Sequence, residues 1–152
     1  MRFEHIIVVN DLLNPLVDPL SLEQLWSGLV GSLENPVRFL PGLDEAKILE
    51  RTPDGFRREL RFGHTVIHDR VRLEPRTRLE VASEPTPEVP ALTRTLTIEE
   101  PVEGEFIVRF VYERRPDGHA PVEAAYLEVL EDAWVAADID LIAQVRREAT
   151  LH

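Results

Sequence analysis

The segment from Phe56 to Val71 predicts a β-hairpin whose register can be counted along the chain. Apolar and polar residues alternate on both sides of Gly63-His64, a pair that suits a two-residue turn with glycine at its first central position. Counting outward from the turn gives the pairs Phe62 with Thr65, Leu60 with Ile67, Arg58 with Asp69, and Phe56 with Val71. One face of the hairpin is therefore apolar except at Arg58 and Asp69. Two charged side chains on an apolar face predict that the interior contains a functional site and is more than a packed hydrophobic core.

The composition predicts one globular domain spanning residues 1–152, with 43% apolar and 30% charged residues. The absence of cysteine excludes disulfides, thiolate catalysis and cysteine zinc sites. A formal charge of -11 repels phosphate backbones, so we expect no nucleic acid partner. No apolar run approaches the roughly 18 residues of a membrane span, and the first residues alternate where a signal peptide would be continuously apolar. We therefore expect a cytoplasmic protein without membrane insertion.

Two short helices are predicted after a first strand at Arg2 to Val9. Ser21 can cap the first helix while Gln24, three residues later, completes a capping box. Asn35-Pro36 predicts the start of the second helix, with Asn as the N-cap, and Pro41-Gly42 predicts its end.

Six further strands are predicted from period-two alternation between turn signals rich in proline and glycine. They are expected at Glu45 to Arg51, Phe56 to Phe62, Thr65 to Leu73, Thr77 to Ser83, Leu92 to Ile98, and Glu105 to Glu113. A long helix from Pro121 to Ala149 would extend about 43 Å, which is enough to cross the whole sheet. Its apolar stripe is Tyr126, Leu130, Trp134, Ala137, Leu141 and Val145. These elements predict an α+β domain in which a curved seven-stranded antiparallel sheet surrounds the long C-terminal helix.

Several motifs resemble the START-like (SRPBCC, helix-grip) superfamily, and in particular its AtaL-like branch. They are Phe3-Glu4-His5, Asn10-Asp11, Asn14-Pro15-Leu16, Gln24-Leu25-Trp26, Gly28-Leu29, Asn35-Pro36, Phe39-Leu40-Pro41-Gly42-Leu43, Arg58-Glu59-Leu60, Leu73-Glu74-Pro75, Thr97 to Pro101, and Arg109-Phe110-Val111-Tyr112. The resemblance implies a cavity between the sheet and the terminal helix. In the superfamily such cavities carry lipids, sterols, polyketides or plant hormones, or host cyclase and dehydratase chemistry. For the AtaL-like branch it supplies no ligand and no catalytic residue.

Alternation also predicts which side chains line the interior. A three-residue turn at Glu74-Pro75-Arg76 places Leu79 and Val81 on the same face as Val71 and Leu73. Pairing Ile98 with Phe106 places Leu96 opposite Val108, Arg94 opposite Phe110, and Leu92 opposite Tyr112. The predicted ligand-binding set is Arg58, Asp69, Phe56, Leu60, Val71, Arg94, Phe110, Tyr112, Tyr126, Leu130 and Trp134.

The pair formed by Arg58 and Asp69 has three interpretations. It can be a satisfied ion pair that holds the strand register, with little net effect on stability because desolvation offsets the attraction. It can orient the polar end of an otherwise apolar ligand. It can also be catalytic, with Arg58 polarising a carbonyl group while Asp69 transfers a proton.

Other candidate motifs are weaker. His64 and His68 lie four residues apart on a strand, about 13 Å, which is too far for one metal ion, so we expect no metal and no cofactor. His5 is expected to be a hydrogen-bonded core or rim residue, whereas Asp138 and Asp140 are expected on the solvated sides of the long helix. Gly28 to Gly31 predicts a small-residue helix contact and lacks the context of a phosphate loop.

The sequence thus predicts a protein that binds a small, mainly hydrophobic ligand with a polar end in a cavity under the terminal helix. The alternative is an enzyme of the polyketide cyclase, aromatase or dehydratase type that uses the same cavity. A third possibility is self-association, as a homodimer, through the outer face or an edge of the sheet.

Overall fold

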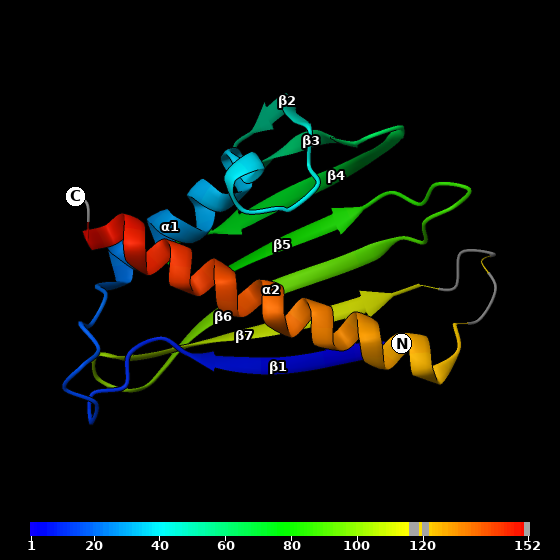
Figure 1. Ribbon diagram of the computed structural model, residues 1–152. Helices are drawn as coiled ribbons and strands as arrows, with labels where there is room; N and C mark the ends of the chain where they lie inside the picture. Colours follow the sequence, from blue (N-terminus) through cyan, green and yellow to red (C-terminus); the bar gives the residue numbers. More distant parts are fainter. Residues whose placement is uncertain (116–118, 120–121, 151–152) are drawn as a thin grey trace.

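The computed structural model describes residues 1–115, residue 119 and residues 122–150. Seven antiparallel strands form one sheet in the order β1-β7-β6-β5-β4-β3-β2, and the long helix α2 lies across one face of it (Figure 1). The strands are β1 (Arg2–Val8), β2 (Glu45–Thr52), β3 (Gly55–Phe62), β4 (Thr65–Glu74), β5 (Arg78–Ser83), β6 (Leu92–Val102) and β7 (Glu105–Arg114). The helices are α1 (Leu22–Glu34), the 3-10 helix η1 (Pro36–Arg38) and α2 (Ala124–Thr150). The predicted α+β class and element order are confirmed.

The capping residues predicted from the sequence are confirmed for α1 and only in part for η1. The Ser21 hydroxyl accepts a hydrogen bond from the Gln24 amide at 3.0 Å, and the Gln24 side chain accepts one from the Ser21 amide at 2.9 Å. The capping box is therefore confirmed. Asn35 is the N-cap residue of η1 and Pro36 is its first residue, as predicted, although the Asn35 side chain makes no capping hydrogen bond. The predicted helix start at Pro121 lies outside the described residues, and α2 is described from Ala124.

The hairpin register predicted from Gly63-His64 is confirmed at every pair. Arg58 lies opposite Asp69 and Leu60 lies opposite Ile67. Gly63 has φ 61°, as the first position of such a turn requires. In the next hairpin the predicted faces are confirmed, since Val81 lies opposite Val71 and Leu79 opposite Leu73, but the turn lies one residue later than predicted because Glu74 pairs with Arg78.

The register predicted for β6 and β7 is wrong by two residues. Ile98 pairs with Val108, Leu96 with Phe110, Arg94 with Tyr112 and Leu92 with Arg114. The strands continue to a two-residue turn between Val102 and Glu105, and a bulge between Glu99 and Val102 absorbs one extra residue. Pro101 within this bulge has no amide hydrogen to donate to the ladder. A shift of two residues keeps every side chain on its predicted face, so only the cross-strand neighbours change.

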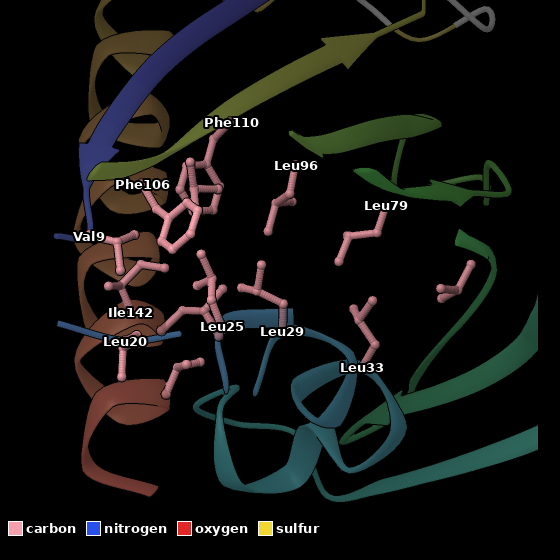
Figure 2. Packing of buried hydrophobic residues seen from close by; sticks show 14 of the residues in the cluster. Val9, Leu20, Leu25, Leu29, Leu33, Leu79, Leu96, Phe106, Phe110 and Ile142 are labelled. Carbon is pink, nitrogen blue, oxygen red and sulfur yellow. The ribbon is translucent and has the colours of Figure 1, made fainter. Parts of the chain in front are cut away.

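The core lies between α1, the C-terminal half of α2 and the inner face of the sheet (Figure 2). Helix α1 contributes Leu25, Leu29 and Leu33, which point toward Leu79 and Leu96 of the sheet (Figure 2). A Cβ added at Gly28 would collide with Val145 of α2, so the glycine lets the two helices approach closely. The predicted helix contact is confirmed at Gly28. Consequently α1 fills the space beneath one half of α2 and leaves the other half to be covered by different residues.

Candidate functional site

The Arg58 and Asp69 side chains form a closed ion pair in the interior. Arg58 Nε and Nη2 donate to the two carboxylate oxygens of Asp69 at 2.9 and 2.6 Å, and the two side chains are only 5% and 4% exposed. Arg58 Nη1 donates to the backbone oxygen of Leu33 at 3.0 Å, near the end of α1. Every nitrogen of this guanidinium therefore has a partner. The geometry favours the structural interpretation, in which the pair joins the β3–β4 hairpin to α1.

Arg94 differs from Arg58 in having no acceptor. It lies on the inner face of β6 opposite Tyr112, and its Nε is buried without a hydrogen-bond partner. Its guanidinium makes no hydrogen bond or ion pair with any described residue. A buried donor without an acceptor costs free energy, which native proteins usually avoid away from functional sites.

Asp138 of α2 is buried beside Arg94, so its predicted place on a solvated side of the helix is wrong. It is 2% exposed, and Tyr112 Oη donates to its two carboxylate oxygens at 2.8 and 2.7 Å. His5 Nε2 is hydrogen-bonded to the same carboxylate at 2.7 Å, which confirms His5 as a hydrogen-bonded interior residue. Asp138 lies four residues after Trp134 and three before Leu141, at the spacing of the apolar stripe, and this signal could have revealed it.

Burial dominates the electrostatics of this cluster. It raises the pKa of Asp138, although the Arg94 charge and the hydrogen bonds from Tyr112 and His5 act in the opposite direction. Burial likewise raises the pKa of Tyr112 far above its usual range, with Asp138 adding to the effect and Arg94 opposing it. Tyr112 therefore stays a neutral hydroxyl that donates to the carboxylate.

Aromatic rings enclose the cluster on the side of β1. The Trp134 ring stacks on Tyr112 with centroids 4.3 Å apart and planes 3° from parallel. The His5 ring stacks on Phe110 at 5.0 Å, and Phe3 contacts both Tyr112 and Trp134. These contacts hold Tyr112 and His5 in place, so the polar atoms around Asp138 are preorganised.

An inner chamber of about 50 Å³ lies between Arg58 and Arg94, with Asp138 in its wall. Its lining residues are Ser32, Leu33, Pro36, Phe39, Leu40, Arg58, Arg94, Ala137, Asp138 and Leu141. A surface groove of about 450 Å³ between η1 and α2 shares Phe39, Leu40 and Leu141 with this chamber. These three side chains therefore border both spaces. The chamber has room for only a few water molecules, whereas sites for drug-sized ligands measure about 300 to 1,000 Å³.

The structure places the predicted ligand-binding residues in different surroundings. Arg58 and Arg94 line the chamber, and Tyr112 and Trp134 lie in the polar cluster beside it. Leu130 is half-buried, whereas Asp69 is engaged by Arg58. Four more are packed in the core and absent from the chamber wall: Phe56, Leu60, Val71 and Phe110. Tyr126 is 55% exposed, so its predicted position in the interior is wrong.

The predicted set missed Asp138 and the loop residues Phe39 and Leu40. In the described part of the chain, no group of three His, Asp or Glu side chains is arranged to hold a metal ion. The described helices also include none that is long and apolar enough to cross a membrane.

The curved sheet with the long helix packed across one face defines a helix-grip fold. The chain belongs to the AtaL family, described as "Acetylaranotin biosynthesis cluster protein L", whose model matches residues 7–150. No curated protein sequence matches the chain at a significant level.

Solved structures with the same fold are distant in sequence. Ara h 8.0201 is 11% identical with a TM-score of 0.66, and the alignment covers 95% of this chain and 97% of that one. The di-domain ARO/CYC StfQ from the steffimycin biosynthetic pathway is 12% identical with a TM-score of 0.72, covering 99% of this chain and 52% of StfQ. The Zhui aromatase/cyclase from Streptomyces sp. R1128 is 16% identical with a TM-score of 0.65, covering 97% and 94% of the two chains. At these identities the likeness establishes the fold alone.

Replacing Arg58 by Met should lower the free energy of unfolding by about 3 to 5 kcal/mol, because it leaves the Asp69 carboxylate buried and unpaired. The double variant Arg58→Met with Asp69→Leu should lose clearly less, since neither charge remains. Equilibrium urea unfolding measures both values. Arg61→Met on the exposed face of β3 serves as the control and should change stability by no more than about 0.5 kcal/mol. A double variant that is less stable than Arg58→Met would contradict the structural interpretation.

The raised pKa of Asp138 makes its effect on stability depend on pH. In the unfolded chain the Asp138 carboxyl titrates near its ordinary pKa of 3.8, whereas in the native protein it keeps its proton to a higher pH. Between these two values stability falls as the pH rises, because the unfolded state binds fewer protons than the native state. Asparagine does not titrate, so the Asp138→Asn variant lacks this loss of stability. Its free energy of unfolding minus that of the unmodified protein should therefore increase from about pH 4 to pH 7, as measured by urea unfolding.

The matched control is Asp140→Asn, since Asp140 is exposed two residues further along α2. Its stability relative to the unmodified protein should stay constant over the same interval. If the free energies of unfolding of Asp138→Asn and the unmodified protein differ by the same amount at about pH 4 and pH 7, burial does not raise the pKa of this carboxyl.

Proposed function

We propose that this protein binds a small, mainly hydrophobic molecule with a polar end in the interior between the sheet and α2. The observation that carries the proposal is the Arg94 guanidinium, which lies in the wall of the inner chamber without an acceptor. A carbonyl, hydroxyl or carboxylate group of a ligand would supply that acceptor and remove the cost of the unpaired donor. The surrounding leucine, phenylalanine and alanine side chains would contact the apolar part.

The ligand would enter from the groove between η1 and α2. Only Phe39, Leu40 and Leu141 are shared by the chamber and the groove, and Phe39 and Leu40 belong to a loop that follows the three-residue η1. Displacing these loop side chains would merge the two spaces into one whose size suits a small organic ligand. The narrow chamber then corresponds to a closed state of the protein.

An enzymatic role is the second candidate, and Asp138 is the observation that favours it. A buried carboxyl with a raised pKa, adjacent to a chamber and to an arginine, is suited to general acid–base catalysis. Arg94 could stabilise an enolate oxygen while Asp138 transfers the proton. Structural similarity to proteins described as aromatase/cyclases supports this candidate through the fold only.

Filling the chamber tests the binding proposal. Ala137 lines the chamber, whereas the neighbouring Ala136, which is equally exposed, is absent from the chamber wall, so Ala137→Leu should block binding and Ala136→Leu should not. The neutral fluorescent probe N-phenyl-1-naphthylamine reports on binding by titration, and we expect Ala137→Leu to weaken its affinity about 10-fold or more. No probe binding to the unmodified protein, or equal binding to both variants, would contradict a ligand site at this chamber.

Turnover separates the second candidate from simple binding. The substrate to test is a linear triketide thioester of N-acetylcysteamine, with cyclised or dehydrated products detected by mass spectrometry. An enzyme should accelerate the reaction, and Asp138→Asn should reduce the rate by about 10² to 10⁴ while probe binding is retained. Equal rates with and without the protein would leave binding as the supported function.

A further inference from the structure

The inner face of the sheet carries a second arginine without a partner, Arg114 of β7. Residues alternate along β7, so Arg114 faces the same side as the buried Phe110 and Tyr112. Its Nη1 is buried and has no hydrogen-bond partner, and its guanidinium makes no ion pair with the described part of the chain. Arg114 was not among the predicted ligand-binding residues because its strand was expected to end at Glu113.

The sheet register places Arg114 next to Arg94. Arg94 lies opposite Tyr112 and Leu92 lies opposite Arg114, so the two arginines are diagonal neighbours on adjacent strands. Such neighbours are about 7 to 8 Å apart at the backbone, within reach of each other's long side chains. Two guanidinium groups with free donors can therefore converge on one acceptor group.

The charges around the two arginines do not neutralise them. The Asp138 carboxylate is near Arg94, yet it is hydrogen-bonded by Tyr112 and His5 and forms no ion pair with either arginine. Asp69 is fully engaged by Arg58. On the outer face, by contrast, Arg109 is paired with both Glu4 and Glu99. Counting the described residues, the inner site thus has a surplus of at least one positive charge in a chain whose net charge is -11.

We propose that Arg94 and Arg114 together form an anion-binding site and that the ligand is an amphipathic monoanion, an apolar body that carries a carboxylate. A planar carboxylate matches the fork of donors on a guanidinium, and one negative charge balances the surplus. The proposal rests on the proposed binding function and narrows it, because a neutral carbonyl or hydroxyl compound would leave one guanidinium without a counter-charge.

Two fluorescent probes that differ only in an anionic group test this inference. They are 8-anilinonaphthalene-1-sulfonate and the neutral N-phenyl-1-naphthylamine, titrated against the unmodified protein and its variants. We expect the sulfonate to bind about 10-fold more tightly or better. Arg94→Met and Arg114→Met should each weaken sulfonate binding about 10-fold. Arg114 is not part of the chamber wall, so Arg114→Met should change neutral-probe binding less than about 2-fold.

The matched control is Arg70→Met, since Arg70 is exposed on the outer face of β4 and should alter neither affinity. Arg114→Lys retains the charge and should retain most of the preference for the sulfonate. Near-ultraviolet circular dichroism of each variant confirms a native core. A sulfonate that binds no better than the neutral probe, or arginine variants that weaken both probes equally, would overturn the anion site. Failure of both probes to bind would overturn the proposed binding function itself.

Discussion

The burial of Asp138 beneath α2 is the constraint on which the arrangement of the interior depends. Its carboxylate is held by Tyr112 of β7 and His5 of β1, so one polar group ties the long helix to two strands at one side of the sheet. The stacking of Trp134 on Tyr112 covers this contact. A carboxylate in such a place costs desolvation energy and is tolerated only because both oxygens are satisfied. The helix therefore has one preferred rotation over the sheet.

Two inward-facing arginines show why burial alone does not identify a functional residue. Arg58 is nearly inaccessible and has partners on all three nitrogens, so removing it would disturb the structure itself. Arg94 is less buried, but it lies beside a chamber and lacks an acceptor. The unpaired donor, and not the degree of burial, is the feature that indicates a missing ligand.

Most of the strand register could be predicted from the sequence where turns were short and regular. The β3–β4 register follows from Gly63-His64, because a two-residue turn leaves one way to align its strands, whereas for β4–β5 only the faces could be predicted, since the turn lies one residue later than Glu74-Pro75-Arg76. The β6–β7 register could not be counted in this way, since a bulge beside Pro101 changes the number of residues in one strand. Alternation still assigned Arg94 to the inner face, since a shift of two residues preserves the face.

The sequence by itself determined the order of elements, the capped start of α1 and the inward direction of Arg58, Asp69 and Arg94, because these follow from local spacing. Only the tertiary structure decided that α1 packs beneath the C-terminal half of α2, leaving a chamber of about 50 Å³ where a ligand cavity was expected. It also decided which groups hold the Asp138 carboxylate, since His5 lies 133 residues away along the chain. Contacts over such separations depend on how the helices and the sheet pack together, and no local pattern encodes that packing.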